Sequence, residues 1–117
     1  MFRTAEAQPS RLQRDVAKAL ASLGASVQEE KVLEEGYSLD LVVDWRGGQL
    51  AVEVDGSFHF VGREPTGATL LKRQQLRHFG WRLVSVPYWE WAELNHSDKL
   101  RQREQRAAYL SALLLEG

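Results

Sequence analysis

Apolar residues between positions 10 and 23 recur at the spacing of one helix face. They are Leu12, Val16, Ala19, Leu20 and Leu23, and residues three or four apart lie on the same side of an α-helix. Ser10 is a typical N-cap, and Gly24 is a typical residue just past a helix end. The pattern predicts a helix over 10–23, with Arg11, Arg14 and Lys18 on its polar face.

Two later segments, 39–45 and 50–55, alternate between apolar and polar residues, as half-buried strands do. Arg-Gly-Gly-Gln separates them at 46–49, which predicts a β-hairpin. A turn centred on Gly47 and Gly48 would pair Trp45 with Leu50 and Asp40 with Asp55. Such a register makes one face of the hairpin wholly apolar. Residues 27–32 form a weaker candidate for a further strand.

The second half of the chain predicts a helix, a strand and a last helix. After a long loop over 56–68, the helix is expected over about 69–79 and the strand over 81–86. Ser97 is the expected cap of the last helix, whose buried stripe would be Leu100, Ala107, Leu110 and Leu114. The strand at 50–55, the helix and the strand at 81–86 form a β-α-β unit, so these strands should be parallel. The predicted fold class is α/β: a small mixed β-sheet flanked by helices, in the order helix, β-hairpin, helix, strand, helix.

Composition narrows the class of protein. The 117 residues, 44% hydrophobic and 26% charged, suit one globular domain spanning 1–117. No apolar run approaches the roughly 18–20 residues that span a bilayer, so no membrane segment is expected. The chain has no cysteine, which excludes thiolate chemistry and fits an intracellular, reducing compartment. The net charge of −1 means that any nucleic-acid binding would depend on local clusters of cations.

The predicted hairpin gathers three carboxylates, Asp40, Glu53 and Asp55, at one end of its polar face. Like charges on directly paired positions destabilise a sheet unless something offsets them. Lys72 and Arg73 or solvent could screen them, which makes the acids an ordinary wet face. A divalent cation, Mg²⁺ or Mn²⁺, could also bind their oxygens. The pattern alone leaves both interpretations open.

His59 follows the acidic strand and lies between two phenylalanines. It is interpreted either as a packed loop residue or as a group that orients a phosphate, donates a proton or completes a metal site. Lys72 and Arg73 are placed at the front of the predicted helix, where backbone N–H groups favour anions. Arg77 lies on the exposed side of the same helix.

Three segments together resemble the RAP domain. They read VEVDGSFHF at 52–60, TGATLLKR at 66–73 and GWRLVSVPYWEW at 80–91, within a matching core of about 37–91. RAP domains are RNA-binding modules, abundant in apicomplexans and also present in plants, algae and animal mitochondrial proteins. They usually end longer organellar proteins that act in RNA processing. The resemblance implies an RNA partner, single-stranded in the first instance, and a mitochondrial or plastid location. It also implies that this chain is either excised from or related to the C-terminus of a longer protein.

The resemblance also implies a restriction-endonuclease-like fold related to the PD-(D/E)XK nucleases. Asp40 matches the first acid of that motif and Glu53 the second, whereas Asp55 stands where those nucleases keep a lysine. The enzyme hypothesis is a metal-dependent endoribonuclease. In it Asp40, Glu53 and Asp55 hold Mg²⁺ or Mn²⁺, and His59 and Lys72 assist at the phosphate or leaving group.

The alternative hypothesis is a non-catalytic RNA-binding module that keeps only the nuclease fold. Its phosphate-binding residues would be cations of the two predicted helices, namely Arg11, Arg14, Lys18, Lys72, Arg73 and Arg77. A third hypothesis is a protein-interaction module that uses the last helix. The basic run at 101–106 of that helix is interpreted as a solvated face.

Overall fold

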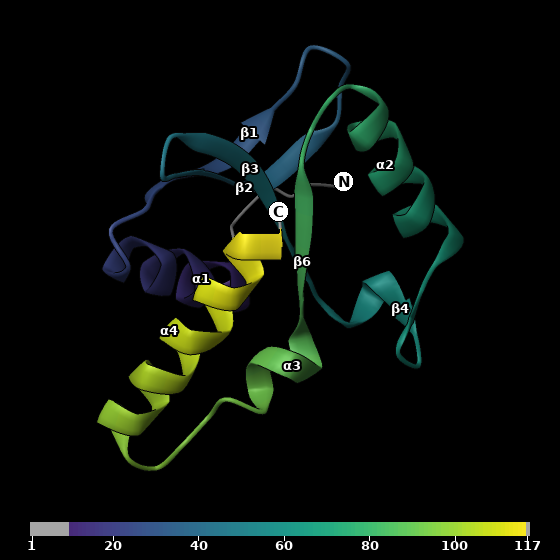
Figure 1. Cartoon of the computed structure of the whole chain (residues 1–117). Helices are drawn as coiled ribbons and strands as arrows, with labels where there is room; N and C mark the ends of the chain where they lie inside the picture. Colours follow the sequence, from purple (N-terminus) through teal and green to yellow (C-terminus); the bar gives the residue numbers. More distant parts are fainter. Residues whose placement is uncertain (1–9, 117) are drawn as a thin grey trace.

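A computed structural model describes residues 10–116 as four strands in one mixed sheet with helices on both faces (Figure 1). The α-helices are α1 (Arg11–Ser22), α2 (Gly67–His78), α3 (Tyr88–Ala92) and α4 (Lys99–Glu116). The strands of the sheet are β1 (Ser26–Val32), β2 (Ser38–Trp45), β3 (Gly48–Asp55) and β6 (Leu83–Pro87). A 3₁₀ turn η1 (Ser57–His59) and the strands β4 (Phe60–Val61) and β5 (Glu64–Pro65) occupy the segment predicted as a long loop.

The sheet has the strand order β1-β2-β3-β6, and β6 lies parallel to β3 while the other pairs are antiparallel. The predicted α/β class, the hairpin and the β-α-β unit are therefore confirmed, and the arrangement is compatible with a restriction-endonuclease-like fold. The weak strand candidate is β1, at the sheet edge. The short helix α3 was not predicted, because its five residues are too few to show a helical period.

The hairpin register differs from the predicted one by two residues. Trp45 pairs with Gly48 and Leu41 with Val52, so the turn consists of Arg46 and Gly47 rather than the two glycines. Both turn residues have positive φ, 50° and 79°, the combination that suits two-residue hairpins because it matches the strand twist. A shift of two does not by itself move any side chain to the other face. It moves Asp40 from beside Asp55 to beside Glu53.

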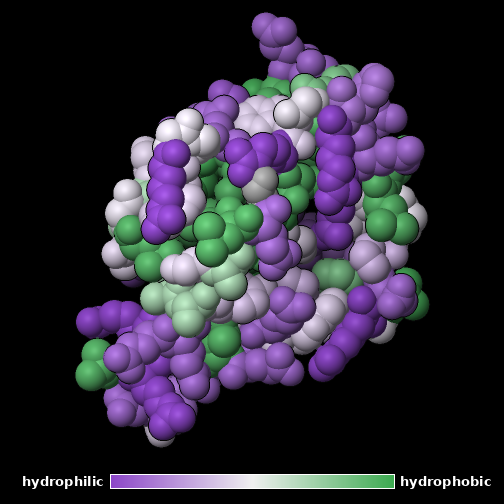
Figure 2. All heavy atoms as spheres, in the orientation of Figure 1, coloured by the Kyte–Doolittle hydropathy of each residue, from purple (hydrophilic) through white to green (hydrophobic). Residues whose placement is uncertain are grey.

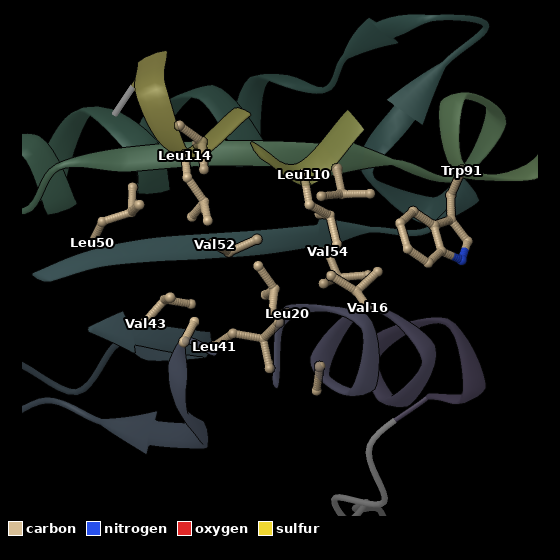
Figure 3. Close-up of a cluster of buried hydrophobic side chains, with 14 residues drawn as sticks. Val16, Leu20, Leu41, Val43, Leu50, Val52, Val54, Trp91, Leu110 and Leu114 are labelled. Carbon is tan, nitrogen blue, oxygen red and sulfur yellow. The ribbon is translucent and has the colours of Figure 1, made fainter. Parts of the chain in front are cut away.

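The larger hydrophobic core lies between the sheet and the helices α1 and α4 (Figure 3). Val16 and Leu20 from α1 and Leu110 and Leu114 from α4 meet Leu41, Val43, Leu50, Val52 and Val54 of the hairpin. Trp91 of α3 closes one end of the cluster. Each large apolar side chain buried in this way contributes about 1.5–3 kcal/mol. The stripe predicted for α4 is right for Leu110 and Leu114, whereas Leu100 is 61% exposed.

A smaller core lies on the opposite face, beneath α2. Leu76 of α2 packs with Leu39, Val42 and Ala51 of the hairpin. Leu39 was predicted on the other face, and its strand pairs irregularly near Glu30, which has a positive φ of 55°. Helices α1 and α2 are thus held on opposite faces of one sheet, which separates their charged residues.

Helix boundaries follow their caps. The Ser10 side chain accepts a hydrogen bond from the Gln13 backbone N–H (3.0 Å), as predicted. Thr66 caps α2 through the Thr69 N–H (3.2 Å), so this helix begins two residues before the predicted start. At α4 the cap is Asp98 rather than Ser97, because its carboxylate accepts from the Leu100 N–H (3.0 Å). In residues 10–116 no helix is long and apolar enough to cross a membrane.

Candidate functional site

The ends of β2 and β3 bring the predicted acids together on the α2 face. The Asp40 backbone N–H donates to Glu53 Oε2 (3.0 Å), and the Val54 N–H donates to Asp40 Oδ2 (2.8 Å). Asp40 is half-buried, whereas Glu53 and Asp55 are only 3% and 1% exposed. Two carboxylates this deeply buried require cationic or hydrogen-bonding partners to persist in the folded state.

Helix α2 supplies those partners from two consecutive residues. Lys72 Nζ lies 2.9 Å from Glu53 Oε1, and Arg73 pairs with Asp55 Oδ2. The sequence suggested that Lys72 could replace the missing nuclease lysine, and the structure does place it against Glu53. The prediction that Lys72 and Arg73 occupy the front of the helix is wrong, because α2 begins at Gly67 and both residues lie in its second turn.

Asp55 is bonded by three side chains from three different elements. Besides Arg73, the Ser85 hydroxyl of β6 donates to Oδ2, and His59 Nδ1 lies 2.7 Å from Oδ1. Arg73 also donates to Ser85 Oγ (3.3 Å). Asp55 therefore ties β6, α2 and η1 to the end of β3. Sequence reasoning missed Ser85, although a serine among the apolar residues of β6 was an available signal.

His59 presents its ring between the buried acid and solvent, with its side chain 43% exposed. Its backbone carbonyl accepts from the Thr66 N–H (2.9 Å) and from the Thr69 hydroxyl (3.3 Å). These bonds fix the η1 segment to the start of α2. With Nδ1 facing Asp55, Nε2 is the ring nitrogen left for a ligand. Beside it, Phe58 is 95% exposed.

Asp40 has a strongly perturbed pKa. Burial, followed by the negative charge of Glu53, raises the pKa of Asp40 from 3.8 to about 7. The hydrogen bond from Val54 and the positive charge of Lys72 act in the opposite direction. Asp40 therefore titrates near neutral pH, which is a property often found at functional sites.

The contacts of the three acids bear on the predicted Mg²⁺ or Mn²⁺ site. Within residues 10–116, five of the six carboxylate oxygens of Asp40, Glu53 and Asp55 have a partner from the chain itself. In the same part of the chain, no three histidine, cysteine, aspartate or glutamate side chains converge as metal ligands would. As they stand, the acids do not fit a three-carboxylate metal site, and metal binding by them stays a prediction.

The predicted phosphate-binding cations fall into separate places. Lys72 and Arg73 are engaged by Glu53 and Asp55. Arg77 is exposed and lines a cavity of about 520 Å³ along β6, where Glu90 and Glu116 are the other charged residues. Arg11, Arg14 and Lys18 lie on α1, across the sheet from α2. The six cations therefore do not form one surface.

Fold and site together define a class of protein: an α/β domain with a buried carboxylate–cation cluster at the ends of its central strands. A sequence model of the RAP domain matches residues 52–113, just over half of the chain. The chain therefore belongs to the RAP domain family, as the resemblance indicated. The match begins at residue 52 and reaches into α4, whereas the expected core ran from 37 to 91, so residues 37–51 with Asp40 lie outside the matched range. Membership in this family suggests an RNA-interacting domain.

One curated relative is the "RAP domain-containing protein, chloroplastic" of Oryza sativa subsp. japonica. It is 38% identical to this chain over 88 residues, which are 73% of the chain. The same residues are 13% of the relative. The chain thus spans only a small part of that protein's length.

Proposed function

We propose that this chain binds RNA without cleaving it, and that its buried acid cluster is a structural anchor. The structural role of the acid cluster is inferred from the contacts that its carboxylates already make. Five of six carboxylate oxygens already contact donors of the chain, and Glu53 and Asp55 are almost fully buried. A catalytic Mg²⁺ needs carboxylate oxygens that are free to exchange with its water shell. Opening this cluster would first break two buried ion pairs.

Family membership supports the RNA partner. The rice relative is a chloroplast protein by name, which supports a plastid as the predicted organelle.

A second candidate function is metal-dependent endoribonuclease activity in a restriction-endonuclease-like fold. The pKa of Asp40 near 7 and the half-exposed His59 held by Asp55 favour it. In that case Asp40 and Glu53, with Asp55 behind them, would hold Mg²⁺ or Mn²⁺. The bound ion would supply a nucleophilic hydroxide and neutralise charge on the phosphate. Lys72 would neutralise Glu53 or the phosphate.

One experiment separates the two functions. Labelled single-stranded RNA is incubated with the wild-type chain and with Asp40→Ala, Glu53→Ala and Asp44→Ala, each in Mg²⁺, Mn²⁺ or EDTA. Asp44 is the matched control, because it is an exposed acid on the same strand. We expect binding in all three buffers and no cleavage above the buffer control. Metal-dependent cleavage that is lost in Asp40→Ala and Glu53→Ala but kept in Asp44→Ala would overturn the non-catalytic function. If the wild-type chain does not bind RNA, the proposal that RNA is its partner is wrong.

A further inference from the structure

A second polar surface lies between α1 and α4, across the sheet from the acid cluster. Two adjoining cavities of about 430 and 630 Å³ occupy it, and they share Asp15, Lys99, Gln102 and Arg106 as lining residues. We call this surface the α1–α4 groove. Figure 2 shows hydrophilic residues gathered at the lower left of the molecule, over the start of α4.

The α1–α4 groove is strongly positive on a chain that is slightly negative. Its charged lining residues are one acid, Asp15, and five cations: Arg11, Lys18, Lys99, Arg103 and Arg106. They sum to +4, and because the whole chain carries −1, the remainder carries −5. A concave surface with one sign of charge concentrates ligands of the opposite sign.

The cations stand in rows along both sides of the groove. Lys99, Arg103 and Arg106 follow one another at spacings of four and three, so they share one face of α4. Arg11 and Lys18, seven residues apart, share one face of α1 in the same way. At 1.5 Å per residue, each row is about 10 Å long. The arrangement fits an extended anion better than a single phosphate.

These cations are available to a ligand. None of the five forms an ion pair with a carboxylate among residues 10–116, in contrast to Lys72 and Arg73. Arg106 lies 4.7 Å from the centre of the Trp91 ring and donates to Asn95 Oδ1 (3.4 Å). Its Nε is buried and has no hydrogen-bond partner in the described part of the chain. The ring contact and the hydrogen bond hold the guanidinium in place, and Arg106 lines both cavities of the groove.

We propose that the α1–α4 groove binds the phosphodiester backbone of RNA. The inference rests on the proposed RNA partner and adds the surface that holds it, on the face opposite the nuclease-like cluster. A strand of RNA can lie in a hollow lined by cations. An anionic membrane instead requires apolar residues that enter the bilayer beside the cations, and the cations here line a concavity.

The test compares two charge reversals on the same helix. Arg103 lines the groove, whereas Arg101 is exposed and does not line it. Binding of a fluorescein-labelled single-stranded oligouridine is measured by anisotropy between 50 and 200 mM salt. We expect Arg103→Glu to weaken binding at least tenfold and Arg101→Glu to change it less than twofold. Arg103→Ala should reduce the slope of log K against log salt by about 0.7, the value for one lost contact to a single strand.

Lys18→Glu, on the opposite side of the groove, should act like Arg103→Glu, with circular dichroism showing that each variant is folded. If the wild type binds RNA and the Arg101 and Arg103 reversals weaken that binding equally, the α1–α4 groove is not the RNA-binding surface. The proposed function would then remain intact. If the wild type binds no RNA, both proposals fail. Phosphatidylserine vesicles are added as a competitor. If they displace the RNA and their binding is lost in Arg103→Glu, the groove binds an anionic membrane instead of RNA.

Discussion

At the scale of single residues, the informative position is Asp55. The resemblance to the PD-(D/E)XK nucleases sets this position against their lysine, so an acid here predicts either an extra metal ligand or a lost active site. In the structure, Asp55 instead binds Arg73, Ser85 and His59. Lys72 and Arg73 of the neighbouring helix α2 supply the cations that offset the charges of Glu53 and Asp55. Asp55 connects three elements that are distant in sequence, namely η1, α2 and β6.

Asp40 should make stability depend on pH. Its pKa of about 7 in the folded state lies above 3.8, so the native state holds this proton more tightly than the unfolded chain does. The cost of the buried charge is absent below about pH 4 and fully present above about pH 7. We expect Asp40→Asn, which keeps an acceptor for Val54, to gain stability relative to wild type as the pH rises through this range, by a few kcal/mol at most.

Urea unfolding at a series of pH values measures this difference, with Asp44→Asn as the control because Asp44 is exposed on the same strand. If the difference in free energy of unfolding between Asp40→Asn and the wild type stays constant from pH 4 to 7, the pKa of Asp40 is not raised.

At the scale of elements, the turn of the hairpin decides which acids meet. A turn over Gly47 and Gly48 would have placed Asp40 beside Asp55, whereas the turn at Arg46 and Gly47 places it beside Glu53. Helix α2 then completes the cluster, because its consecutive Lys72 and Arg73 reach acids that lie two residues apart on β3. One turn and one helix thus bring the acids together with their two cationic partners.

Two glycine-to-alanine substitutions should have opposite effects on the free energy of unfolding. Gly47 has φ of 79°, whereas Gly67 begins α2 without a positive φ, and an added Cβ meets no atom within 4 Å at either position. Gly47→Ala should cost about 1–2 kcal/mol through backbone strain alone. Gly67→Ala should stabilise the chain by about 0.5–1 kcal/mol, because it restricts the unfolded state. Urea titration measures both. A Gly47→Ala variant that is as stable as the wild type or more stable would show that the turn tolerates a different conformation.

At the scale of the whole molecule, the sheet separates two groups of cations. Lys72 and Arg73 of α2 pair with buried acids. The cations that line the α1–α4 groove are Arg11 and Lys18 of α1 and Lys99, Arg103 and Arg106 of α4. The separation also accounts for the combination of a net charge of −1 with a proposed polyanion ligand. The binding charge is local and lies away from the nuclease-like cluster.

This separation predicts complementary effects of two substitutions. Arg73→Met should lower the free energy of unfolding by about 3–5 kcal/mol, since it leaves Asp55 charged and buried without its main partner. It should leave RNA affinity within a factor of two under conditions in which the variant is folded. Arg103→Glu should weaken RNA binding and change stability by less than about 0.5 kcal/mol. Urea unfolding and anisotropy on both variants test the pair. A loss of RNA affinity in folded Arg73→Met would place the RNA at the acid cluster instead.

Local patterns in the sequence determined much of this protein. Hydrophobic periods located α1, the hairpin, α2, β6 and α4, and the β-α-β order required parallel neighbours, because these features depend on residues close in the chain. The family followed from short motifs, and the acids were assigned to the correct face because a register shift of two preserves sides.

Only the tertiary structure decided which charges meet. Three outcomes depend on pairs of residues far apart in sequence. Arg73 contacts Asp55 rather than being left for a phosphate, and Ser85 joins the cluster. Lys18 and Arg103 line the same groove. Electrostatic partners are chosen by distances of a few ångströms. The sequence supplies the charges, and the packing of helices on a sheet sets those distances.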